Sequence, residues 1–82
     1  MKLQYRVVKE TMRDDCDNGF KKEIVGYFPS KKGAEKFVNN KDNLEMWKTE
    51  YKKVMSIITL EIIIETIKDG DIEQSEVYFL FE

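Results

Sequence analysis

Histidine is absent from this chain of 82 residues, and cysteine occurs once. Without histidine, the protein lacks the side chain that most often acts as a general base, proton shuttle or metal ligand near neutral pH. A single thiol, Cys16, can form neither an intrachain disulfide nor a thiolate-rich zinc site. The lone thiol also fits a reducing compartment, so we expect a cytoplasmic protein.

Several motifs that carry chemistry are missing as well. The sequence has no glycine-rich phosphate loop and no serine-elbow motif. The acidic residues 14–19 match a calcium loop only in part, because its third and twelfth positions fall on Cys16 and Val25. No apolar run is long enough to span a membrane, and the first residues lack the features of a signal peptide. We therefore expect a protein that is not an enzyme, binds no cofactor or metal, and has no membrane partner.

Charge is plentiful but unevenly placed. The chain has 14 basic and 16 acidic residues, which give a net charge of −2. Residues 21–53 carry nine basic and five acidic side chains, whereas residues 54–82 carry one lysine against seven acidic side chains. Such a dipolar surface can steer association with a charged partner, or the charges can simply solvate the helices and strands.

The clearest local signal lies at residues 26–38. Pro29 cannot donate to a sheet ladder, so a strand should end at Phe28. Ser30 can then cap a helix by accepting a hydrogen bond from a free backbone N–H. Apolar residues at helical spacing follow as far as Val38. The sequence therefore predicts a strand-to-helix junction here.

The residues before this junction predict a hairpin. Apolar alternation favours strands over residues 3–11 and 23–28. Between them, Asn18-Gly19 is a dipeptide typical of a type I′ turn. A two-residue turn at this point would place Asp15 opposite Lys22 and Met12 opposite Val25.

The residues after the junction predict further helix and two more strands. One helix should run from Ser30 to about residue 39, and a second, capped by Asn43, over residues 43–53; one longer, kinked helix is the alternative. Residues 56–66 are dense in β-branched side chains and predict a central strand, with Ile58 on its apolar face and Ile57 on the other. A turn at residues 68–71 and a strand over residues 77–81 complete the chain.

This order, ββα(α)ββ, indicates a single compact α+β domain over residues 1–82. We expect a four-stranded antiparallel sheet with one or two short helices packed on it. The last strand is apolar on both faces, so either the second helix or a second copy of the protein should cover the remaining face. The sequence therefore favours a homodimer.

Candidate partner-binding residues form three groups: the acidic loop, the start of the first helix and the central strand. They are Asp14, Asp15 and Asp17; Lys31, Lys32 and Lys36; and Glu61 and Glu65. The two glutamates share one strand face, with room for Glu76 on a neighbouring strand. Paired carboxylates can perform acid–base chemistry, but we interpret these as solvating an outer sheet face.

The lysines of residues 31–53 are interleaved with Trp47 and Tyr51, a combination that can meet a phosphate backbone. The negative net charge opposes this interpretation. The helical spacing of the two aromatic residues favours core positions for both. Nucleic-acid binding through this basic segment stays as the second functional hypothesis.

The N-terminal half resembles a group of known proteins. The acidic hairpin with Asn18-Gly19, followed by the pattern Gly26-Tyr27-Phe28-x-Ser30-x-x-x-Ala34-x-x-Phe37, is similar to small accessory proteins of bacteriophages and prophages. The resemblance covers about the first forty residues. It implies a phage-type protein in the cytoplasm of an infected or lysogenic bacterial host, where it binds and modulates or inhibits a host protein. A structural subunit of a larger assembly is a third hypothesis.

Overall fold

The structure, a computed structural model, describes residues 2–14 and 19–82. Over these residues the chain forms six elements: β1 (Leu3–Arg13), β2 (Phe20–Phe28), α1 (Lys31–Val38), α2 (Lys41–Lys53), β3 (Ile57–Lys68) and β4 (Asp71–Phe81). The strands make one antiparallel sheet in the order β2-β1-β3-β4. The predicted α+β architecture is confirmed.

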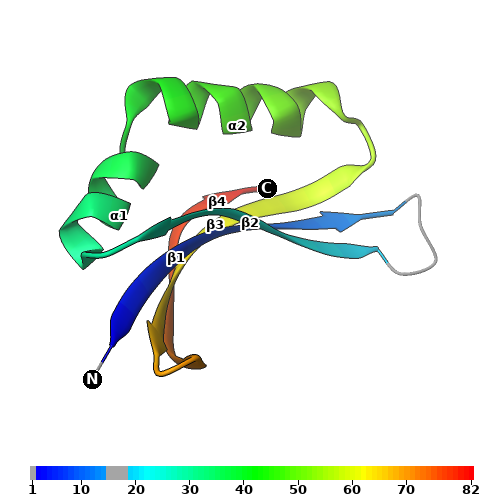
Figure 1. Cartoon of the computed structure of the whole chain (residues 1–82). Coiled ribbons are helices and arrows are strands. Elements are labelled where there is room, and N and C mark those ends of the chain that lie inside the picture. Colours follow the sequence, from blue (N-terminus) through cyan, green and yellow to red (C-terminus); the bar gives the residue numbers. More distant parts are fainter. Residues whose placement is uncertain (1, 15–18) are drawn as a thin grey trace.

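Both helices lie on the same side of the sheet. Because β2 and β3 each run antiparallel to β1, the connection through α1 and α2 passes over β1 and covers that face (Figure 1). Within the described ranges, the opposite face carries no helix (Figure 1). The second helix therefore does not cover the second face.

The core fills the space between the helices and the sheet. It contains buried side chains from α1, α2, β1 and β3: Ala34, Val38, Trp47, Val7, Leu60, Ile62 and Ile64. The Phe37 ring lies between the rings of Phe28 and Trp47, with centroids 5.1 and 6.1 Å away. Trp47 is 1% exposed, as its helical spacing predicted.

The strand-to-helix junction forms as the sequence predicts. β2 ends at Phe28, and the side chain of Ser30 accepts a hydrogen bond of 3.1 Å from the backbone N–H of Gly33. The predicted cap of the second helix is wrong by three residues. Asn40, not Asn43, accepts from the backbone N–H groups of residues 42 and 43, so α2 begins at Lys41. An asparagine at either position satisfies the same local rule, so the sequence signal alone does not choose between them.

The predicted register of the first hairpin is also wrong. Met12 pairs with Phe20 rather than Val25, and Lys22 pairs with Glu10. Asp15 and Asn18 lie outside the described residues, so Gly19 is the part of the predicted turn dipeptide that the structure describes. Register follows the fit of both strand faces to their surroundings, which a turn dipeptide alone does not encode.

The second hairpin, between β3 and β4, closes with a tight turn. Asp69 and Gly70 have φ angles of 50° and 90°, and Lys68 pairs with Asp71 on either side of them. Two consecutive positive φ angles are the signature of a type I′ turn, whose twist matches that of the flanking strands. The turn lets β4 begin at Asp71, earlier than the predicted residue 77.

The predicted assignment of residues to the two faces of β3 is wrong near the start of the strand. The register shifts between Met12 and Arg13, so Ile57 packs against the core and Ile58 is exposed. From Leu60 onwards the alternation of β3 follows the prediction, with even-numbered apolar residues facing the helices.

The sheet bends away from the helices along its strands, so its backbone is concave on the helix-free side (Figure 1). Near the level of Val8, each edge strand contains an extra residue: Val25 in β2 and Tyr78 in β4, which also has a second register shift nearer its start. A bulged strand bends locally, and two bulges at one level bend the whole sheet there. Both extra residues pack towards the core.

Candidate functional site

The three groups of residues predicted from the sequence do not form one surface. In the acidic loop, Asp14 is exposed, and its backbone N–H donates a 3.0 Å hydrogen bond to the carbonyl of Ser56. Asp15 and Asp17 lie outside the described residues. Among the described residues, no ion pair joins Asp14 to the lysines of α1 or to Glu61 and Glu65.

The predicted lysines lie on α1, on the helical side of the molecule. Lys32 and Lys36 are exposed, whereas Lys31 forms an ion pair of 3.1 Å with Glu76 on β4. That pair places Glu76 on the helical side, so the expected grouping of Glu76 with Glu61 and Glu65 is wrong. Of the aromatic residues in this segment, Trp47 is buried and provides no stacking platform for a base.

Glu61 and Glu65 lie on the helix-free face. Glu65 is 4% exposed, so the expectation that it solvates an outer sheet face is wrong. It accepts hydrogen bonds from the guanidinium of Arg6 at 2.7 Å and from the ammonium of Lys22 at 2.8 Å. Burial raises the pKa of Glu65, but these two hydrogen bonds outweigh it and hold the pKa below its ordinary value.

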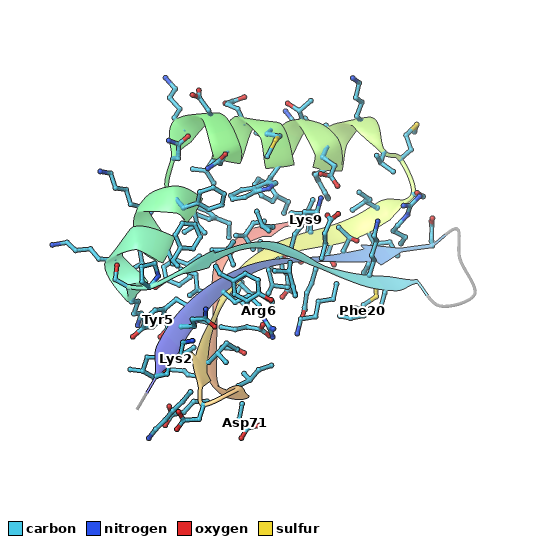
Figure 2. The ribbon with its side chains drawn as sticks, in the orientation of Figure 1. Lys2, Tyr5, Arg6, Lys9, Phe20 and Asp71 are labelled. Atoms are coloured by element: carbon cyan, nitrogen blue, oxygen red, sulfur yellow. The ribbon has the colours of Figure 1, made fainter. Side chains whose placement is uncertain are left out.

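This ion cluster explains why the middle of an uncovered sheet face is dry. Lys22 sits opposite Glu10, and Glu65 sits opposite Arg6, so the bond from Lys22 to Glu65 crosses β1 at Val8. Val8 is 0% exposed although no helix lies on this face. The aliphatic part of a long lysine side chain can cover an apolar residue while its charged end reaches a partner. Figure 2 shows Arg6 and Phe20 on this side of the sheet, and Lys9 on the side of α2.

An apolar row crosses all four strands at the level of Val8. Strand pairing aligns Ile24 of β2, Val8 of β1, Ile63 of β3 and Val77 of β4. The two central residues are buried, while Ile24 and Val77 are 47% and 56% exposed. We call these four residues the apolar row.

More apolar side chains surround the apolar row. Of the eleven large hydrophobic residues that are exposed in the described chain, seven lie on the helix-free face: Met12, Phe20, Ile24, Tyr27, Ile72, Val77 and Leu80. Single exposed apolar residues are ordinary, but a contiguous group on one face marks an interaction surface.

Two carboxylates lie beside the apolar row, at the level of Lys22 and on the side opposite Arg6 and Glu65. Glu10 of β1 and Glu61 of β3 are direct cross-strand neighbours. Like charges in that position repel each other. In the part of the chain that the structure describes, neither carboxylate forms an ion pair. A hollow of about 30 Å³ lies between them and the side chains of Met12, Phe20 and Thr59.

On the helical side, Lys9 links the sheet to α2. Its ammonium lies 2.8 Å from Glu50 of α2 and 2.9 Å from Glu23 of β2. Burial lowers the pKa of Lys9, but the hydrogen bonds to both carboxylates raise it by more. This network links α2 to one face of the sheet. The opposite face has no such helical layer among the described residues.

The described residues contain no cluster of three or more side chains that could hold a metal ion. Neither helix among them is long and apolar enough to cross a membrane. A further surface depression, of about 290 Å³, lies beside the β3–β4 turn and is lined by Lys2, Gln4, Ile67, Asp69 and Gly70.

Comparison with known proteins does not place the chain in a family: no family model, no curated protein and no solved structure matches it.

Sequence reasoning missed Arg6, Lys22 and the exposed apolar residues of the edge strands. Arg6 and Glu65 are 59 positions apart, so no local pattern connects them. The alternation of β1 does place Arg6 and Val8 on one face. With the register between β1 and β3 known, this alternation would have placed the Arg6 guanidinium on the same face as Glu65.

Proposed function

We propose that this chain is a small non-enzymatic accessory protein that binds another protein through its helix-free sheet face. The resemblance to phage accessory proteins supports a bacterial host protein as the target, which the chain modulates or inhibits. The observation that carries the proposal is the group of seven half-exposed apolar side chains on that face. Protein interfaces combine apolar area with charged and polar groups.

The helix-free face has both, with the ion cluster near its middle and exposed apolar side chains mainly on the edge strands β2 and β4. Ile24, Val77 and Leu80 offer apolar area, and the ion cluster of Arg6, Lys22 and Glu65 offers fixed charges beside it. Because Glu65 holds both cations, their side chains are partly ordered before a target arrives, which lowers the entropy cost of binding.

Capture from a bacterial lysate tests this proposal with a matched pair of variants. Val77→Asp places a charge in the apolar row, whereas Met46→Asp places the same charge on α2 at a similar exposure, 54% against 56%. Tagged wild type and both variants are incubated with lysate, with and without nuclease treatment, and bound proteins are quantified by mass spectrometry. We expect a near-stoichiometric protein to bind wild type and Met46→Asp but not Val77→Asp.

Two results would contradict the proposal. If Val77→Asp captures as much target as wild type, the target binds another surface. If every captured protein disappears after nuclease treatment, the basic segment of residues 31–53 binds nucleic acid instead. The exposed lysines of α1 and α2 are then the residues to change.

A further inference from the structure

Two like charges face each other across the central strands of the helix-free face. Glu10 of β1 and Glu61 of β3 are direct cross-strand neighbours, and both side chains are half-buried. Carboxylates in this position repel each other, which costs the fold stability. A rule of strand pairing that is broken in the middle of an exposed face indicates a position kept for function rather than for folding.

We propose that the target presents a lysine or arginine side chain that enters the space between Glu10 and Glu61, on a segment whose neighbouring residues are apolar. The inference rests on the proposed function, since it names the chemistry of the target that the helix-free face binds. The cation of the target replaces one repulsive contact by two attractive ones. Binding therefore relieves an unfavourable pair that the free protein carries.

The cation beside this pair is held by another carboxylate. Lys22 of β2 is the cross-strand neighbour of Glu10, but its ammonium lies 2.8 Å from Glu65. Glu65 is 4% exposed and needs that cation, because a buried carboxylate without full pairing is costly. Together with Arg6 and Glu61, these side chains carry two positive and three negative charges. One negative charge is left for a partner, so the face favours a cationic target over a polyanion such as nucleic acid.

The space between the two carboxylates fits the charged end of a basic side chain. A hollow of about 30 Å³ lies there, lined also by Met12, Phe20 and Thr59. A water molecule needs about 10–15 Å³ of such space, and an ammonium group is of similar size. Lysine and arginine each carry several N–H donors, so one cation can donate to both carboxylates. A metal ion is a poorer fit, since the described residues include no group of three or more side chains that could hold it.

Exposed apolar side chains surround the two carboxylates. Leu80 of β4 pairs with Glu61, while Met12 and its partner Phe20 follow Glu10 towards the end of the first hairpin. These three apolar residues are 46–48% exposed, and Phe20 lies on the helix-free side of the sheet (Figure 2). The aliphatic stem of a basic residue can pack on such surface while its charged end reaches a carboxylate. Arginine in an apolar, desolvated surround is a frequent hot spot of protein interfaces.

Urea unfolding tests whether the pair is kept for binding. Glu61→Gln keeps the shape of the side chain and ends the repulsion, so the midpoint should rise by about 0.2–0.5 M. Glu45→Gln removes a charge from an exposed position on α2 and should leave the midpoint unchanged. A midpoint that falls with Glu61→Gln would show that the fold itself uses this charge, which overturns the inference.

A library of random displayed peptides, selected on immobilised wild type, tests the chemistry of the occupant. We expect the recovered peptides to carry lysine or arginine beside apolar residues. Synthetic copies should bind the double variant Glu10→Gln/Glu61→Gln at least about tenfold more weakly than wild type, and Glu45→Gln as tightly. Replacing the basic residue of a peptide by methionine should cause the same loss on wild type and no further loss on the double variant. Exchanging lysine and arginine in the peptide shows which of the two the face prefers.

Each remaining outcome overturns the inference or separates it from the proposed function. A selection that returns no peptide, or only peptides without a basic residue, overturns it, as does a basic peptide that binds the double variant as tightly as wild type. A chain that sediments at twice its mass of 9.8 kDa and takes up no peptide has a second copy on this face, which also overturns it.

Capture from lysate shows which of the two proposals has failed. If Val77→Asp abolishes capture and Glu10→Gln/Glu61→Gln does not, the proposed function stands and the inference fails. If Val77→Asp captures as much target as wild type, the proposed function itself fails.

Discussion

Glu65→Gln is the most informative single substitution for the stability of the helix-free face. The change keeps the volume and one acceptor oxygen of a side chain that is 5% exposed, but removes its charge. Two charge-assisted hydrogen bonds are weakened, and each is worth about 1.5–3 kcal/mol. Breaking a fully buried ion pair costs about 3–5 kcal/mol.

The expected cost here is lower than for a fully buried pair. The side chains of Arg6 and Lys22 are 19% and 36% exposed, so both cations can regain water when the carboxylate is lost. We therefore expect Glu65→Gln to lower the free energy of unfolding by about 2–3 kcal/mol. Urea unfolding followed by the fluorescence of the buried Trp47 measures this directly.

The loss should depend on pH in a defined direction. The folded pKa of Glu65 lies below its ordinary value of 4.5, so the ion cluster adds stability above that pH. That stability disappears as the pH falls through the folded pKa. The difference between wild type and Glu65→Gln should therefore be constant near neutrality and shrink below pH 4.5.

Glu76→Gln is the matched control. Its carboxylate pairs with Lys31 on the surface, with side-chain exposures of 37% and 44%, so its loss should not be measurable. The reasoning is refuted if Glu65→Gln and Glu76→Gln unfold at the same urea concentration as wild type.

Three further changes test how local features contribute. Ser30→Ala removes the cap of α1 and should cost about 1 kcal/mol in urea unfolding; an unchanged midpoint would show that the cap is dispensable. Gly70→Ala adds a Cβ that meets no atom within 4 Å, so any loss, about 1–2 kcal/mol, reports only the strain of its 90° φ angle. Tyr78→Phe removes the 2.7 Å hydrogen bond to Glu35 and should cost about 1 kcal/mol. Because burial and that bond raise the pKa of Tyr78, one of the four tyrosines should resist alkaline ionisation in wild type, as followed by absorbance, but not in this variant.

Local features were accessible from the sequence. The end of β2 and the cap at Ser30 depend on Pro29 and its immediate neighbours, and the core position of Trp47 follows from helical spacing. The turn at residues 68–71 could be predicted because positive φ angles are least costly at glycine and its polar neighbours. These features need contacts between residues only a few positions apart.

Pairing between strands was not accessible in the same way. The turn dipeptide suggested Met12 opposite Val25, but the sheet pairs Met12 with Phe20. Register depends on how both faces of a strand fit their neighbours, and β1 has strand partners on either side. A hairpin signal constrains only one of those two pairings.

The sequence by itself determined the order of elements, the amphipathic helices and the helix-facing side of β3, because each follows from short-range periodicity. Only the tertiary structure decided the role of Glu65, since its partners Lys22 and Arg6 lie 43 and 59 positions away. Tertiary structure also placed both helices on one face and thereby left seven half-exposed apolar side chains on the other. Burial of a charge and exposure of an apolar group are properties of packing between distant segments, which no local pattern specifies.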